Sequence, residues 1–256
     1  MIHPSAIVHP KAELGANVSI GAYSVVGEHV VIGADTWVGP HVVIEGRTRI
    51  GAHNRIFQFC SLGAVPQDKK YGGEPTELHI GERNTIREFC SINCGTVQDA
   101  GVTRVGNDNW IMASVHIAHD CQVGNLTQFA NHATLAGHVH IGDYAILGGF
   151  TGVHQFVHIG AHSFTAIATV LVHDLPPYVM AAGDTAKAYG INVEGLRRRG
   201  FSAESLAAIK RAYKTLYKSG LTLDQAKREL AQQAANCAEV ALLAGFLQGS
   251  TRGIVR

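Results

Sequence analysis

A repeat of six residues runs through most of this chain and constrains its fold more than any other feature. Every sixth residue is aliphatic at Leu14, Ile20, Val26, Ile32, Val38, Ile44, Ile50, Ile56 and Leu62, and glycine follows most of these positions. The period resumes at Ile80 and, displaced by one residue, runs from Val105 to Leu171. An α-helix repeats every 3.6 residues and a strand every two, so neither explains a period of six. This period is typical of a parallel β-helix, which we expect over residues 1–185.

Three successive hexads would make one triangular coil, each side being a short strand stacked on the coils above and below. Because neighbouring strand residues point in opposite directions, the aliphatic residue and the one two positions earlier should face inward. The earlier inward positions hold small or β-branched residues, as a narrow prism requires: Val18, Ser24, Val30, Thr36, Val42 and Cys60. We expect the glycines to occupy corners, where the backbone turns tightly.

The repeat breaks at two places, residues 64–75 and 95–104, which are polar and rich in glycine. Long loops on a rigid scaffold often carry function, so both are candidate parts of a site. The β-helix should end near residues 174–177, where Pro176 and Pro177 cannot donate hydrogen bonds to a strand.

Residues 186–256 have a helical pattern and are predicted to form a separate C-terminal domain. Ser202 can cap a helix that extends to about Lys218 and is closed by Gly220. Two further helices should begin at capping boxes, in which a side chain at the start of a helix and another three residues later cap each other's backbone N–H groups. These pairs are Thr222 with Gln225, and Asn236 with Glu239.

The charges and cysteines restrict the class of protein. The net charge of the 256 residues is +1, but it divides into −6 for residues 1–185 and +7 for residues 186–256. The basic end is either a solvated helical surface or an attractor for a polyanion. Nucleic acid is not expected as a partner, because no aromatic residues alternate with the basic ones. No apolar stretch is long enough for a transmembrane segment, no signal peptide is apparent, and five cysteines without a CxxC pair suggest a reduced cytoplasmic protein.

Histidine is abundant, and several histidines lie at positions that should face outward. A coil of eighteen residues would place Gly137 directly above His119, and His138 above Asp120. A glycine over a histidine leaves a pocket with an accessible backbone N–H. This arrangement suits acyl transfer, since the histidine can take a proton from a hydroxyl while the N–H stabilises an oxyanion. Alternatively, outward histidines such as His116 and His119 fill a polar interface between subunits.

Metal binding is another interpretation of the histidines. His116 and His119, or the stacked pair His140 and His158, could ligate zinc, as histidines do in the β-helical gamma-class carbonic anhydrases. The H-x4-H pair of that family has no clean match in this chain. We therefore predict no metal and no other cofactor.

The chain resembles the bacterial UDP-N-acetylglucosamine O-acyltransferases, hexapeptide-repeat enzymes that open lipid A synthesis. The segments that carry the resemblance span the chain and include residues 67–71 (QDKKY), 95–97 (GTV), 116–121 (HIAHDC), 135–139 (LAGHV), 153–156 (VHQF) and 192–201 (NVEGLRRRGF). The resemblance implies a left-handed β-helix, an exception to the usual handedness of crossovers. It also implies a homotrimer with sites between subunits, with UDP-N-acetylglucosamine as acceptor and a 3-hydroxyacyl group on acyl carrier protein as donor.

By the same resemblance, His119 would be the general base for the sugar 3-hydroxyl, Asp120 would support it, and Gly137 would donate the oxyanion N–H. The residues that would contact the sugar, the acyl chain and the nucleotide are Asp68, Lys70, His116, His138, His154, Gln155, Asn192, Glu194, Arg198 and Arg199. Arginine suits the nucleotide end because its planar guanidinium matches phosphate oxygens. Steering the acidic carrier protein is a second possible role for the basic C-terminal region.

Two departures from the family pattern affect the expected site. Many members carry His-Arg before Gly-Thr-Val, whereas this chain has Asn93 and Cys94, so one sugar-site histidine is missing. Ile167 aligns with the position that measures acyl length, where glycine admits longer chains. A branched residue there should block the end of the acyl tunnel and select a medium-length chain. A sister enzyme that acylates the 3-amino analogue of the sugar is the nearest alternative, followed by a zinc carbonic anhydrase and a non-catalytic β-helix.

Overall fold

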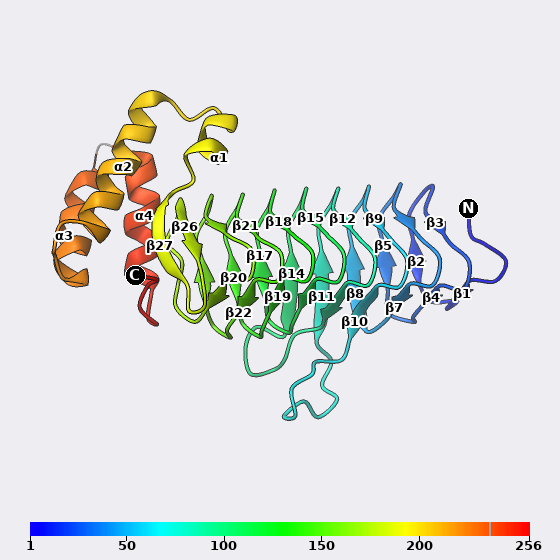
Figure 1. The fold of residues 1–256 in the computed structure, drawn as a ribbon. Helices are drawn as coiled ribbons and strands as arrows, with labels where there is room; N and C mark the ends of the chain where they lie inside the picture. Colours follow the sequence, from blue (N-terminus) through cyan, green and yellow to red (C-terminus); the bar gives the residue numbers. More distant parts are fainter. Residues whose placement is uncertain (236) are drawn as a thin grey trace.

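The computed structural model describes residues 1–235 and 237–256, and its main body is a triangular prism of stacked coils (Figure 1). Each coil contributes one strand to each of three parallel sheets. The first sheet contains β1 (Ile7–Val8), β4 (Val25–Val26), β7 (Val43–Ile44), β10 (Ser61–Ala64), β13 (Ser91–Asn93), β16 (His116–Ile117), β19 (Thr134–Leu135), β22 (Gly152–Val153) and β25 (Val170–Leu171). The parallel β-helix predicted from the six-residue period is therefore confirmed.

The other two sheets follow the first in chain order around each coil. The second contains β2 (Glu13–Leu14), β5 (Val31–Ile32), β8 (Arg47–Ile50), β11 (Glu77–Ile80), β14 (Val102–Val105), β17 (Gln122–Val123), β20 (His140–Ile141) and β23 (His158–Ile159). The third contains β3 (Ser19–Ile20), β6 (Trp37–Val38), β9 (Arg55–Ile56), β12 (Thr85–Ile86), β15 (Trp110–Ile111), β18 (Gln128–Phe129), β21 (Ile146–Leu147), β24 (Phe164–Thr165), β26 (Val179–Ala182) and the antiparallel β27 (Lys187–Ile191).

The inward positions form the core as predicted. The periodic aliphatic residues from Ile20 onward are buried, and so are the residues two positions before them. The polar inward residues are hydrogen-bonded to the neighbouring coil: the Ser24 hydroxyl donates to the Gly39 carbonyl at 2.8 Å, and Thr36 donates to Gly51 at 3.0 Å. Such bonds offset the cost of burying a hydroxyl.

The expected role of glycine at the corners is wrong. Most corner residues with left-handed backbone are not glycines: Asn17, Tyr23 and Asp35, for example, have φ of 58°, 58° and 56°, and Gly46 is an exception at 62°. The glycines are required instead for close approach between coils. A Cβ on Gly21 would lie 2.5 Å from the carbonyl carbon of Gly39, so a larger residue would force two coils apart.

Both breaks in the period are excursions that leave the prism on one side (Figure 1). The ordinary spacing between stacked residues is 18, as for Asn17 and Asp35, but Asn54 and Asn84 are 30 apart and Ser91 and His116 are 25 apart. The first excursion therefore adds complete hexads and preserves the period. The second does not, which explains the displacement by one residue.

The β-helix does not end at Pro176 and Pro177, contrary to the prediction. Leu175 bridges Ile159 in parallel, and β26 pairs in parallel with β24. The prolines are tolerated because they occupy a corner, where the flanking residues make the hydrogen bonds: Leu175 N donates to His158 O and Tyr178 N to Ala161 O, each at 2.9 Å. β27 then pairs with β26 and completes the third sheet.

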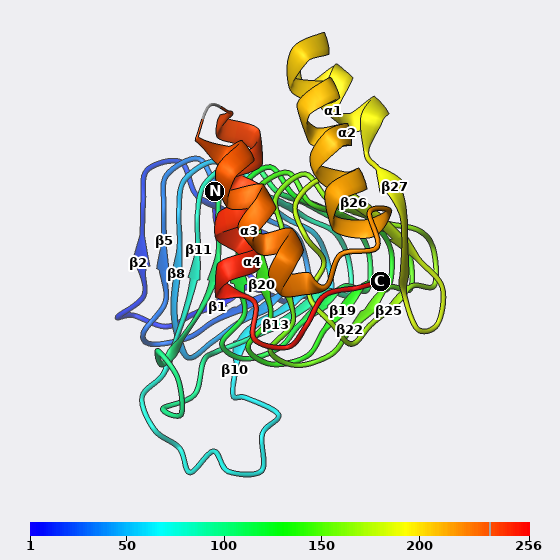
Figure 2. The ribbon, with the colours of Figure 1, turned by 90° about the vertical axis from the view of Figure 1, so that its left-hand side faces the viewer.

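The helices cover one end of the prism (Figure 2). They are α1 (Val193–Arg198), α2 (Ala203–Tyr217), α3 (Leu223–Ala234) and α4 (Ala238–Gly249). The Ser202 cap of α2 and the Thr222–Gln225 capping box of α3 are confirmed, whereas α1 was not predicted. The other expected capping box involves Asn236, which lies outside the described residues. The domain boundary at residue 185 stays a prediction.

Candidate functional site

The predicted base lies at the corner between the first and second sheets, beside both excursions. A cavity of about 690 Å³ opens there. It is lined by Gln67, Asp68, Lys69, Lys70, Gln98, Asp99, His119, His138, Gln155 and Phe156. The cavity therefore brings together five residues that the sequence assigned to one site, Asp68, Lys70, His119, His138 and Gln155.

The predicted stacking of Gly137 on His119 is confirmed. A Cβ built on Gly137 would lie 2.7 Å from His119 Nε2 and 3.0 Å from Nδ1, with the ring carbon between them closer still. Only glycine leaves room for the ring in this position. The Gly137 N–H has no acceptor among the described residues, so it is free to bind a ligand atom.

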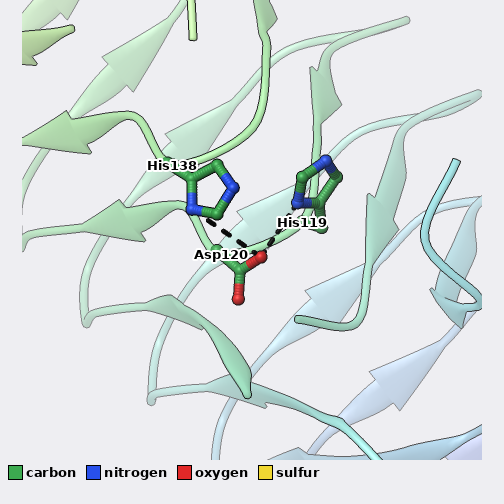
Figure 3. Close-up of side chains that lie close together, drawn as sticks. All are labelled: His119, Asp120 and His138. Atoms are coloured by element: carbon green, nitrogen blue, oxygen red, sulfur yellow. Dashed lines mark hydrogen bonds and ion pairs between the residues drawn. The ribbon is translucent and has the colours of Figure 1, made fainter. Parts of the chain in front are cut away.

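Asp120 holds the His119 ring from behind. The Asp120 side chain is fully buried, and its Oδ2 accepts a hydrogen bond from His119 Nδ1 at 2.9 Å (Figure 3). Thr96 donates twice to the same carboxylate, from its backbone N to Oδ1 at 2.8 Å and from its hydroxyl to Oδ2 at 2.7 Å. With Nδ1–H committed to Asp120, the unprotonated nitrogen of neutral His119 is Nε2, the one beneath Gly137.

His138 is the second histidine of the cavity. Its Nδ1 lies 2.8 Å from Asp99 Oδ2 and 3.8 Å from Asp120 Oδ2. The ring stacks on Phe156 at 4.4 Å and meets the His119 ring edge-on at 5.0 Å. The hydrogen bond from His138 lowers the pKa of Asp99 below its ordinary value. Asp99 and Thr96 were not assigned roles from the sequence, although both lie in the second break of the repeat.

Two predicted residues on the same coils lie outside the cavity lining. His116 bonds through Nδ1 to the Ser91 hydroxyl at 2.8 Å, and burial, followed by the nearby His119, lowers its pKa. His154 is exposed, and its Nδ1 lies 3.4 Å from a guanidinium nitrogen of Arg252 in the C-terminal segment.

The four residues predicted for the nucleotide end lie at a different corner, between the second and third sheets. Asn192 is buried and caps α1, accepting from Gly195 N at 3.1 Å and donating to His162 O at 3.2 Å. Arg199 donates to Tyr144 O at 3.0 Å and covers the Tyr144 ring at 5.1 Å. Glu194 pairs with Arg197 at 2.8 Å, and Arg198 is exposed.

Ile167 lies at the third corner, across the first sheet from His119. Its neighbour Ala168 hydrogen-bonds to Gly149 in the coil below, and Ile167 itself is 71% exposed. Within one chain, the predicted base, ruler and nucleotide residues thus occupy three separate corners.

The unusual pair Asn93 and Cys94 has a structural position at the foot of the first excursion. Asn93 is buried and donates to Val65 O at 2.9 Å, while its Oδ1 has no partner among the described residues. The buried Cys94 thiol donates to Gly63 O at 3.2 Å. Both side chains therefore fasten the loop that carries Asp68 and Lys70.

A metal in the cavity would have to compete with the hydrogen bonds that His119 and His138 already make. His119, Asp120 and His138 bring three potential ligand atoms within 4.8 Å of one another. The atoms involved already join the two histidines to Asp99 and Asp120. The rings of His140 and His158 are stacked at 4.5 Å and 18°, which makes them neighbours in a polar ladder rather than convergent ligands.

A histidine backed by a carboxylate and placed under a free backbone N–H, on a coil of hexapeptide repeats, defines a hexapeptide-repeat acyltransferase. Family comparison agrees: residues 103–137 match the bacterial transferase hexapeptide model, and residues 174–255 match the second domain of UDP-N-acetylglucosamine O-acyltransferase.

The chain belongs to the UDP-N-acetylglucosamine O-acyltransferase family. It is 65% identical to the acyl-[acyl-carrier-protein]–UDP-N-acetylglucosamine O-acyltransferase of Thiobacillus denitrificans, over 100% of this chain and 99% of that protein. Solved enzymes of this name from Moraxella catarrhalis and Francisella novicida superpose with TM-scores of 0.97 and 0.98 at 47% and 43% identity. These alignments cover 100% of this chain and 99% and 94% of the two structures, respectively. The fold is accordingly the left-handed parallel β-helix, and the protein is an acyltransferase.

Among the described residues, no helix has the length and apolar character that crossing a bilayer requires.

Proposed function

We propose that this enzyme transfers a 3-hydroxyacyl group from acyl carrier protein to the 3-hydroxyl of UDP-N-acetylglucosamine, the first step of lipid A synthesis. The observation that carries the mechanism is the His119 ring, tied to Asp120 at 2.9 Å and lying directly beneath Gly137. One side of the imidazole is thereby fixed, while the other faces the cavity.

The reaction requires a base and an oxyanion donor close to the same point. His119 Nε2 takes the proton of the sugar hydroxyl as its oxygen attacks the thioester carbonyl carbon. The Gly137 N–H, which has no acceptor among the described residues, stabilises the negative oxygen of the tetrahedral intermediate. Collapse breaks the carbon–sulfur bond, and the leaving thiolate takes the proton from His119. Asp120 stabilises the imidazolium between these two transfers.

The cavity supplies polar groups for the acceptor. Asp68 and Lys70 line the cavity from the first excursion, and Gln155 lines it from the coil stacked on that of Gly137. The Lys70 backbone N donates to Asp68 Oδ1 at 3.0 Å, which fixes the turn that carries both residues. We assign the sugar to this space, with His116 and His154 as contacts at its margin.

The separation of the predicted residues supports a homotrimer whose sites lie between subunits. Asn192, Glu194, Arg198 and Arg199 are at one corner, His119 at the second and Ile167 at the third. One bound substrate can meet all of them only if neighbouring subunits contribute different corners. Size-exclusion chromatography with light scattering should therefore give three times the 27.3 kDa mass of one chain.

The +7 charge of residues 186–256 supports docking of the acidic carrier protein at the helical end. Five free cysteines are consistent with a reducing compartment, and we propose that the reaction takes place in the cytoplasm.

The test is product formation by purified protein from UDP-N-acetylglucosamine and 3-hydroxyacyl carrier proteins of several lengths. We expect an O-acylated sugar nucleotide, and a rate at least about 10²-fold lower for His119→Ala. The 3-amino sugar nucleotide serves as a comparison substrate. A larger kcat/KM for that amine would refute the proposed acceptor, and an unaffected His119→Ala variant would refute the proposed base.

A further inference from the structure

Asp99 connects the second excursion to the cavity through a contact that has no role in the reaction described above. Its carboxylate reaches a histidine 39 residues further along the chain, with Oδ2 lying 2.8 Å from His138 Nδ1. The His138 side chain is only 10% exposed, whereas that of Asp99 is 44% exposed at the cavity rim. The contact therefore joins an exposed carboxylate of the loop to a nearly buried imidazole ring.

The loop that carries Asp99 is held by other groups. Thr96 binds Asp120 through its backbone N and its hydroxyl, at 2.8 and 2.7 Å. Gly95 N donates to Glu77 O at 3.1 Å, and Glu77 N donates to Gly101 O at 2.9 Å. Within its own loop the Asp99 carboxylate interacts only with the backbone N–H of the adjacent Ala100, so the fold of the loop rests mainly on the Thr96, Gly95 and Glu77 bonds.

The surroundings of His138 leave its ring two flipped orientations. Phe156 stacks on one face at 4.4 Å, and the His119 ring stands edge-on at 5.0 Å, so the ring plane is fixed by packing. A half-turn about the bond from Cβ to the ring would exchange a nitrogen for a carbon beside Asp99. Asp120 Oδ2 cannot decide between the two orientations, because at 3.8 Å it is beyond hydrogen-bond distance and already accepts from Thr96 and His119.

We propose that Asp99 is a positioning residue, which fixes the orientation and tautomer of His138 so that His138 Nε2 is presented to the bound nucleotide sugar. The identity of that ligand rests on the proposed function. With its proton held on Nδ1 by Asp99, neutral His138 offers Nε2 as a hydrogen-bond acceptor for a sugar hydroxyl or amide. Figure 3 shows this second nitrogen on the side of the ring toward His119, away from the dashed contact with Asp120.

Steady-state kinetics of two variants separate this role from simple loop support. In Asp99→Ala the acceptor is lost, and we expect KM for UDP-N-acetylglucosamine to rise about 3- to 10-fold, as for loss of one hydrogen bond, with a smaller change in kcat. Asp99→Asn keeps an oxygen that accepts from Nδ1–H and should restore KM to within about 2-fold of wild type. Val97→Ala is the matched control, because Val97 is an exposed residue on the same loop and does not line the cavity. Equal KM for Asp99→Ala and Val97→Ala would overturn the proposal, as would an Asn variant as impaired as the Ala variant.

Nitrogen NMR of protein labelled with ¹⁵N-histidine gives a readout that does not need turnover. The His138 signals are identified by their absence from a His138→Gln sample. We expect the Nδ1–H form in wild type and Asp99→Asn, and a shift toward the Nε2–H form in Asp99→Ala. An unchanged His138 spectrum in Asp99→Ala would overturn the proposal. If wild type forms no acylated sugar at all, the proposed function fails, while the spectra still decide the role of Asp99.

Discussion

The Gly137→Ala substitution should displace the His119 ring while changing the stability of the coil only slightly. The new methyl group would lie 2.7 Å from His119 Nε2, whereas carbon and nitrogen atoms in contact are separated by about 3.5 Å or more. The ring must therefore move by roughly 1 Å and lengthen its 2.9 Å bond to Asp120. The Gly137 φ is not in the left-handed region, so alanine is compatible with the backbone there.

A misplacement of this size in a reacting group costs about 10²-fold in rate. That factor corresponds to about 2.7 kcal/mol of lost transition-state stabilisation. The backbone N–H remains in the variant, so the loss reports on the base rather than on the oxyanion donor. The free energy of unfolding should fall by no more than about 1.5 kcal/mol, because only one side-chain hydrogen bond is weakened.

The assay is kcat for acyl transfer, together with urea unfolding of the same samples. Gly152→Ala is the control, since Gly152 lies on β22, the strand stacked on β19 just before Gly137, and a Cβ there would meet no atom within 4 Å. A Gly137→Ala rate within about 3-fold of this control would refute the argument. Equal large losses in both variants would show that the sheet, and not the His119 ring, is responsible.

Three further predictions concern different parts of the molecule. Thr96→Val removes one of the hydrogen bonds to buried Asp120, so urea unfolding should show a loss of about 1–3 kcal/mol, and a wild-type value would contradict the assigned contact. Ile167→Gly should shift the preferred donor to a longer acyl chain in competition assays, and an unchanged preference would exclude Ile167 as the ruler. Burial, and then the charge of Arg199, lowers the pKa of His162 from 6.5 to about 4. Between these two pH values His162 is protonated in the unfolded chain but not in the folded chain. The free energy of unfolding should therefore fall as the pH drops from about 6.5 to 4, and fall less in His162→Phe. Parallel curves of unfolding free energy against pH for the two proteins would contradict this.

The prism could be predicted almost completely from the sequence because its interactions are periodic. One aliphatic position in six sets the inward face, and the fixed coil length sets which residues stack, which is why the stacking of Gly137 on His119 follows from the sequence alone. The corner glycines were misread, since sequence shows where glycine occurs but not whether it serves a turn or a close approach. At Pro176 and Pro177 the sequence shows a missing donor but not that the position requires none.

The excursions were predictable as loops but not as contacts. Thr96 reaches Asp120 and Asp99 reaches His138 only because the loop folds back onto a later coil. No period relates these residues, and a polar loop of this composition fits many conformations. Helix α1 was missed for a similar reason: it has only six residues, and its cap, Asn192, also bonds to the prism.

The two ends of the prism are unequal, and this limits how the molecule can associate. The helices pack over the last coils through Tyr213 and Tyr217, whereas the first coil is bare, with Ile7 66% exposed on the outermost strand β1. An uncovered edge invites another strand, but Pro4 and Pro10 flank β1 and have no N–H to offer. The prolines therefore make the outer edge of β1 a poor template for a further strand.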